Sequence, residues 1–175
     1  MASLNKGLRK VEIRLRWDPS PLGRPPHDLD VVAATYTADE PYGKPSYVVH
    51  FGSRSPDGTI TLSRDSRTGQ GFGSDEVMVL ELERLAARYA RVVVGVVIQQ
   101  RNGERTFQDI ANPRVVIAEG HTELAADDFA RVADSTAATV AEFTRDASGE
   151  WELHEALRGF DGDPESFAAV MGSRS

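Results

Sequence analysis

The segment at residues 10–17, KVEIRLRW, alternates apolar and charged residues without a break, and this constrains the fold more than any other feature. Its apolar positions are Val11, Ile13, Leu15 and Trp17. A period of two is the period of a β-strand that buries one face and exposes the other. The segment therefore predicts a half-buried strand whose apolar side chains face a core.

Similar short runs follow along the chain. We predict further strands at residues 29–37, 46–51, 59–63, 77–82, 91–99, 113–119, 136–144 and 151–157. The run at 91–99 is apolar on both faces, which favours a central strand. We predict a short helix at 83–90 and another at 163–172, with Asp163 as its N-cap and Pro164 as its first helical residue.

Turn signals separate these runs and indicate the fold class. SPDG at 55–58 predicts a hairpin-type turn between the strands on either side, and DASGE at 146–150 predicts a second turn. Eight or nine short strands with little helix predict an all-β fold. We expect a two-sheet β-sandwich with a few short helices, including one at the C-terminus. A chain of 175 residues suits one domain, residues 1–175.

The composition of the chain excludes some classes of binding partner and of metal site. The net charge of −7 argues against nucleic acid, which needs a basic surface, and favours binding of cations. The chain has no cysteine, which excludes disulfides and thiolate metal sites. The N-terminus lacks an apolar segment of signal-peptide length, and the longest apolar run, 92–98, is too short to span a bilayer. We predict a soluble, cytoplasmic protein.

A glycine-rich segment at 64–76, RDSRTGQGFGSDE, carries Asp65, Asp75 and Glu76. The twelve residues from Asp65 to Glu76 begin and end like an EF-hand loop, but Arg67 stands at a ligand position and the flanks are strand-like, so we exclude an EF-hand.

A second interpretation is a phosphate-binding loop, because TGQGFG could offer backbone amides to a phosphate. A strand follows it, however, and the neighbouring acids repel phosphate unless a cation bridges them.

A calcium site built from sandwich loops is a third interpretation. Calcium takes six to eight hard oxygens, and glycines let a loop turn its carbonyls toward an ion. Asp28 and Asp30 stand two apart at a strand start, so both point out together if Leu29 faces the core. Asp57 in SPDG and Asp18 add acids, and gathered carboxylates repel without a cation. The alternative is a set of separate turn acids in solvent, and composition leaves both open.

Six motifs carry a resemblance to a known family. They are SLNKG (3–7), RWD (16–18), DLD (28–30), SPDG (55–58), RDSRTGQGFGSDE (64–76) and RGFDG (158–162). In order and spacing the chain resembles, over nearly its whole length, the TerD family of bacterial tellurium-resistance and general stress proteins. The resemblance implies a β-sandwich that binds calcium, usually two ions close together, through loops at one end. It implies links to tellurite and stress resistance, and no established catalytic activity.

Carried over position by position, the resemblance also implies a ligand set. Its side-chain ligands would be Asp28, Asp30, Asp57, Asp65, Asp75 and Glu76, with main-chain oxygens from Arg67 or Gly69. The chain departs from the family pattern at Ser66, where asparagine is usual, and at Ser74, where aspartate is usual. Arg64 replaces a glycine. Each departure lowers the oxygen count or the negative charge, so we expect one of the two ions to bind weakly or not at all.

Two functions of different classes follow from these observations. The first is a non-enzymatic calcium-binding stress protein whose ions order the loops and create a surface for a partner protein or a membrane. The sequence carries no nucleophile–base spacing and no pair of histidines at metal-ligand spacing. The alternative is a metal-dependent protein or enzyme that binds a nucleotide or another phosphate ligand. That function requires a concave pocket beside the metal loops.

Overall fold

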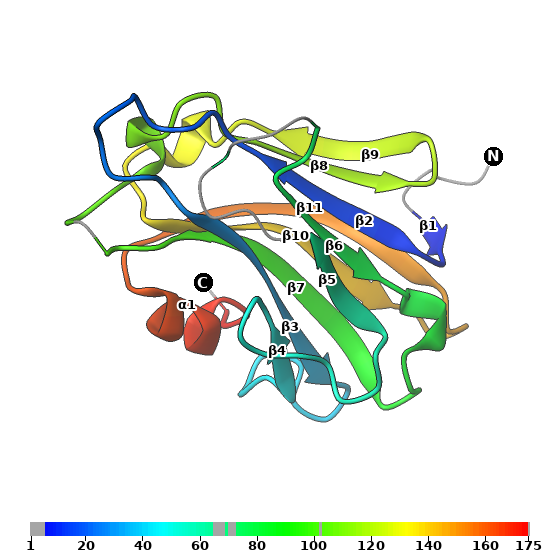
Figure 1. Cartoon of the computed structure of the whole chain (residues 1–175). Coiled ribbons are helices and arrows are strands. Elements are labelled where there is room, and N and C mark those ends of the chain that lie inside the picture. The colour runs from blue at the N-terminus through cyan, green and yellow to red at the C-terminus, as the bar shows by residue number, and fades with distance from the viewer. Residues whose placement is uncertain (1–5, 65–68, 70–72, 102, 175) are drawn as a thin grey trace.

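The computed structural model describes residues 6–64, 69, 73–101 and 103–174. Two antiparallel sheets stack face to face (Figure 1). One has six strands in the order β1-β11-β10-β7-β3-β4, and the other has five in the order β5-β6-β2-β8-β9. The single α-helix of the described residues is short, and three 3-10 helices accompany it. The predicted all-β sandwich is therefore confirmed.

The six-stranded sheet is built around β7. Its strands are β1 (Lys6–Leu8), β3 (Leu29–Thr37), β4 (Tyr47–Val49), β7 (Tyr89–Ile98), β10 (Ala137–Arg145) and β11 (Trp151–Phe160). As predicted for a strand that is apolar on both faces, β7 is buried on both. Val92 and Val94 pack into the core between the sheets, whereas Val93 and Val97 pack into a second cluster on the outer face.

The five-stranded sheet supplies the other wall of the core. Its strands are β2 (Val11–Arg16), β5 (Ile60–Arg64), β6 (Glu76–Leu80), β8 (Arg114–Glu119) and β9 (Thr122–Asp127). Val11, Ile13 and Leu15 of β2 have no exposed surface, as the alternation predicted. Because β2 lies at the centre of this sheet, its register with β6 and β8 positions the residues at both of its ends.

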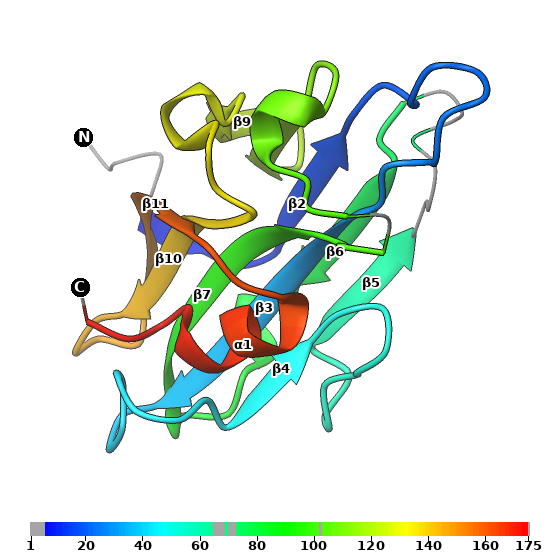
Figure 2. The ribbon, with the colours of Figure 1, turned by 90° about the vertical axis from the view of Figure 1, so that its left-hand side faces the viewer.

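The C-terminal helix α1 (Pro164–Val170) covers the outer face of the six-stranded sheet (Figure 2). Asp163 is its N-cap, as predicted, and accepts a hydrogen bond from the Ser166 backbone N–H at 2.8 Å. Phe167 packs from the helix onto β7 and β3. None of the described helices is long and apolar enough to cross a membrane.

Two local predictions were wrong. The helix predicted at 83–90 is a 3-10 helix limited to Leu82–Arg84, because the chain enters β7 at Tyr89 and strand pairing overrides the local helix preference. SPDG does not close a hairpin. Strand β4 pairs with β3 in one sheet and β5 pairs with β6 in the other, so the turn lies on a connection that crosses between the sheets.

Two strands lacked a recognisable pattern. β1 has only three residues, and β9, TELAAD, contains few β-branched or aromatic residues and is exposed or half-buried throughout. β9 forms because Gly120, at φ +59°, turns the chain back so that β9 pairs with β8. The turn at 146–150 was predicted correctly: the Asp146 N–H donates to the Glu150 carbonyl between β10 and β11.

Candidate functional site

Four of the predicted acids lie at one end of the sandwich, where β3 and β6 begin and β2 ends. Leu15 of β2 is opposite Glu76 of β6, and Leu29 of β3 is opposite Ile98 of β7. Asp28, Asp30, Asp75 and Glu76 are all buried, with exposed fractions of 7, 2, 2 and 0 %. Buried carboxylates are rare unless they are paired or bind a cation, so this end of the molecule is the candidate site.

Asp75 closes the end of β2. Its backbone N–H donates to the Leu15 carbonyl at 2.8 Å, and its Oδ2 accepts a hydrogen bond from the Trp17 N–H, also at 2.8 Å. The carboxylate thus satisfies a backbone donor at the point where the pairing of β2 with β6 ends. A hydrogen bond to a charged acceptor is stronger than one between neutral groups, so Asp75 fixes the position of Trp17.

Glu76 links the two sheets. It belongs to the five-stranded sheet, yet its Oε1 accepts a hydrogen bond from the Val31 N–H of the six-stranded sheet. Strand β4 pairs with β3 from Ala33 to Thr35, and Val31 lies before that stretch. The carboxylate therefore serves a strand N–H beyond the end of β4. Since Glu76 has no exposed surface, this bond is shielded from water.

Asp28 and Asp30 lie on the same side of β3, as predicted, and Leu29 and Val31 face the core between the sheets. Both carboxylates are nevertheless buried. Asp30 Oδ2 accepts from Gln99 Nε2 at 2.6 Å, and Asp28 Oδ2 forms an ion pair with Arg101 Nη1 at 3.4 Å. Gln99 and Arg101 follow the end of β7, and sequence reasoning missed both. The available signal was that both residues lie at or just beyond the end of the central strand predicted at 91–99.

Gly69 packs against Trp17 at this end. Its φ is +76°, a conformation that glycine adopts without strain. A Cβ atom there would lie 2.5 Å from Trp17 Nε1, which is the atom that donates to the His27 carbonyl at 3.1 Å. Trp17 thus contacts both Gly69 and His27, and its backbone N–H donates to Asp75.

We therefore expect Gly69→Ala to destabilise this end of the protein. The methyl group would meet the indole of Trp17 and would strain a residue at positive φ, and overpacking of this kind costs about 1–3 kcal/mol. Thermal unfolding should show a lower midpoint, and the tryptophan emission should shift as Trp17 moves. Gly58→Ala is the control, because Gly58 also has positive φ, +73°, but no atom within 4 Å of its added Cβ. An equal loss in both variants would mean that backbone strain alone is responsible.

Asp57 is not brought to the other acids. It lies in the turn before β5, whereas the glycine-rich segment follows the far end of that strand. Its Oδ1 accepts hydrogen bonds from Thr59 Oγ1 at 2.7 Å and from the Thr59 N–H at 3.1 Å. Burial acts to raise the pKa of Asp57, but the Thr59 bonds and the nearby Arg84 outweigh it and hold the pKa below its usual value. Asp57 is a turn-capping acid here.

Asp65 and Arg67 lie outside the described residues. Within the described part of the chain, no three or more histidine, aspartate or glutamate side chains are arranged to hold one metal ion. Calcium is the ion that the family resemblance implies, and the donors present fit its preference for hard oxygens. Protein donors contact each of the four buried carboxylates, and these contacts orient the groups.

The chain is similar to proteins of known structure over nearly its full length. A solved structure of a protein of unknown function superposes with a TM-score of 0.95 at 63 % identity and covers 97 % of this chain and 99 % of that one. A homologue of the telluride resistance protein TerD from Streptomyces coelicolor A3(2) gives a TM-score of 0.94 at 62 % identity, covering 97 % and 100 %.

The named relatives of this chain include tellurium resistance proteins. The tellurium resistance protein TerD of Serratia marcescens is 26 % identical over 94 % of this chain and 88 % of its own length. The family model described as the TerD domain matches residues 1–169. This chain belongs to the TerD family.

Proposed function

We propose that the protein is a non-enzymatic calcium-binding stress protein of the tellurium-resistance type. The observation that carries the proposal is the burial of Asp28, Asp30, Asp75 and Glu76 at one end of the sandwich. An ionised carboxylate loses hydration when it is buried, and the loss must be compensated by donors or by a cation. Four such groups beside a glycine-rich acidic segment favour a multivalent cation as part of the compensation.

Several donors at this end are uncharged. Trp17 and Val31 donate through neutral backbone N–H groups, and Gln99 donates through a neutral amide. Arg101 brings a positive charge to Asp28, but its side chain is 54 % exposed, so solvent screens the pair. Ca²⁺ carries two positive charges, so one or two ions would neutralise the four acids. Further oxygens would come from the glycine-rich segment, where Asp65 is the first candidate.

The bound ions would order the loops at this end and present a surface to a partner protein or to a membrane in the cytoplasm. The alternative, a phosphate ligand held at the same end, is disfavoured by the pocket next to Gln100. That pocket of about 480 Å³ is lined by Glu104, Asp161 and Asp163, whose negative charges would repel a phosphate that no cation bridges.

Calcium should therefore stabilise the fold. A ligand that binds only the native state adds about 2.7 kcal/mol at a hundred times its dissociation constant. For a domain of this size that raises the melting temperature by several degrees, at about 2–4 °C per kcal/mol. The measurement is thermal unfolding of chelator-treated protein with and without millimolar Ca²⁺, with Mg²⁺ as the comparison. Identical melting curves with and without Ca²⁺ would contradict the proposal, and an equal effect of Mg²⁺ would favour the phosphate alternative.

A further inference from the structure

A second pocket lies on the outer face of the six-stranded sheet, beside the C-terminal segment. It has a volume of about 480 Å³, and residues of β7, β10 and β11 line it together with Tyr42 and the end of the chain. The pocket and the candidate metal site lie at opposite ends of β3. Arg91, at the base of the pocket, pairs with Tyr36 near the C-terminal end of β3, whereas Asp30 of the metal site is near its N-terminal end. We propose that this pocket binds the phosphate group of a small phosphomonoester.

Positive charge gathers in this pocket although the protein is acidic. Three arginines, Arg91, Arg158 and Arg174, line it together with one carboxylate, Glu142. Three positive charges less one negative charge leave +2, in a chain whose net charge is −7. A phosphomonoester carries about −1.5 to −2 at neutral pH, so its charge matches that of the pocket.

Arg91 forms a rigid base for the site. Its side chain is buried, and its Nη1 donates to the carbonyls of Pro41 and Gly172, each at 2.7 Å. Its Nη2 donates to Glu142 Oε2 at 3.2 Å, while Nε is buried without a hydrogen-bond acceptor among the described residues. Its guanidinium also lies 4.6 Å from the centre of the Tyr42 ring, so Arg91 is held in place on several sides and lines the pocket with a fixed positive charge.

Arg158 and Arg174 are the residues that can reach a ligand. Arg158 Nη1 donates to the Ser173 carbonyl at 3.2 Å, and its guanidinium lies 4.4 Å from the centre of the Phe160 ring. Arg174 lies 4.2 Å from the centre of the Tyr42 ring and forms no hydrogen bond within the described part of the chain. A guanidinium has five N–H donors, and both groups therefore keep donors for phosphate oxygens.

The pocket's size indicates more than an inorganic ion. Small-molecule pockets span about 300–1,000 Å³, and apolar side chains usually line most of their surface. Val93, Leu157 and Met171 supply apolar surface next to the arginines. A phosphate group on the arginines would place an organic body against these side chains. A phosphate group also occurs in the headgroups of phospholipids. The experiment must therefore distinguish binding of a lipid surface from binding of a free phosphomonoester.

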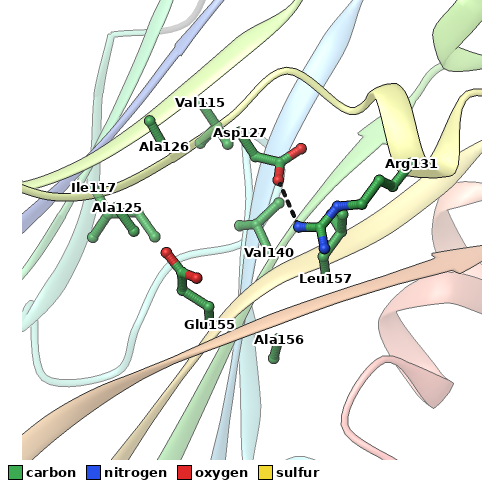
Figure 3. A pocket seen from close by; sticks show the side chains of 10 residues that line it. All are labelled: Val115, Ile117, Ala125, Ala126, Asp127, Arg131, Val140, Glu155, Ala156 and Leu157. Atoms are coloured by element: carbon green, nitrogen blue, oxygen red, sulfur yellow. Dashed lines mark hydrogen bonds and ion pairs between the residues drawn. The ribbon is translucent and has the colours of Figure 1, made fainter.

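A second arginine-containing pocket provides an internal comparison. It has a volume of about 350 Å³ and lies between the sheets (Figure 3). There Arg131 forms an ion pair with Asp127 at 3.5 Å, and Glu155 lies on the opposite side of the pocket. Its two carboxylates outnumber the one guanidinium, so we expect no binding of phosphate. Arg131 is therefore a matched control for the loss of one surface arginine.

The test is a calorimetric and NMR titration of chelator-treated protein, in low salt, with phenyl phosphate, inorganic phosphate and phenol. We expect saturable binding of phenyl phosphate, weaker binding of inorganic phosphate and none of phenol. The double variant Arg158→Gln/Arg174→Gln should weaken phenyl phosphate binding at least tenfold, and Arg131→Gln should leave it unchanged. Arg174→Gln alone should give a smaller loss, which keeps the test valid if the double variant is poorly folded.

Three outcomes would overturn the proposal. An equal loss of affinity in Arg131→Gln, or the absence of saturable binding, would mean that the arginines attract phosphate only as a diffuse counter-ion. Binding to vesicles that contain phosphatidic acid, without binding of phenyl phosphate, would assign the chemistry to a lipid surface. Because the protein is freed of calcium by chelator before the titration, the result is independent of the calcium proposal.

Discussion

Gly95→Ala should lower the melting temperature by several degrees. Gly95 lies in the middle of β7, directly beneath α1, and a Cβ atom there would be 2.5 Å from Phe167 Cζ and 2.9 Å from the Ala138 carbonyl oxygen. The phenyl ring can swing away, but the carbonyl belongs to the adjacent strand β10 and cannot move without disturbing the sheet. Overpacking of this kind costs about 1–3 kcal/mol, and each kcal/mol shifts the midpoint by about 2–4 °C in a domain of this size.

The control for this prediction is Gly162→Ala. An added Cβ at Gly162 would approach Ser166 Cβ at 3.6 Å, which is an ordinary contact. Combining Gly95→Ala with Phe167→Ala should cost less than the sum of the two single changes, because the second removes part of the clash that the first creates. Equal destabilisation by Gly95→Ala and Gly162→Ala would show that the close approach of α1 to β7 is not the reason why position 95 requires glycine.

The strands could be predicted where the apolar pattern of a single segment shows how many of its faces are buried. The alternation of β2 and the two-sided apolar run of β7 each reflect how many faces of the strand are buried, and the structure confirms both. β9 was missed because its exposed sequence has no such pattern, and its strand depends on pairing with β8. SPDG was misread because local turn chemistry does not determine whether the next strand joins the same sheet.

The candidate site was predictable only in part. The acids at positions 28, 30, 75 and 76 were identified by their motifs, and the strand register places them at one end. Their partners were not predictable, because Gln99 and Trp17 are distant in sequence from the acids that they contact. Asp57 was assigned to the same group because the family resemblance places a ligand at the acid of the SPDG turn. Only the strand pairings show that this turn lies at the opposite end of β5.

Glu76 is the residue at which a structural role and a metal-binding role can be separated. As an acceptor for the Val31 N–H it holds the two sheets together, and that role requires an oxygen but no charge. As a calcium ligand it would contribute charge, since the number of anionic ligands tunes the calcium affinity of a site. Glutamine keeps the oxygen and removes the charge, whereas alanine removes both.

We therefore expect Glu76→Gln to weaken calcium binding at least tenfold while it changes the melting temperature in chelator only slightly. Glu76→Ala should weaken binding similarly and also cost about 1–3 kcal/mol of stability in chelator, because the buried Val31 N–H loses its acceptor. The measurements are calcium calorimetry and thermal unfolding of both variants. Asp146→Asn is the control. The Asp146 carboxylate accepts hydrogen bonds from the backbone N–H groups of Ser148 and Glu150 within the β10–β11 turn, away from the candidate site.

Asp146→Asn should leave calcium affinity unchanged at low and at high salt. A diffuse attraction to an acidic surface would respond to any lost carboxylate and would fade with salt, because the Debye length is only about 8 Å at physiological ionic strength. A bound ion instead depends on particular carboxylates and is screened far less. If Glu76→Gln binds calcium as tightly as the unaltered protein does, the buried glutamate acts only as a link between the sheets. The calcium proposal would then lose the one acid at this end that has no exposed surface.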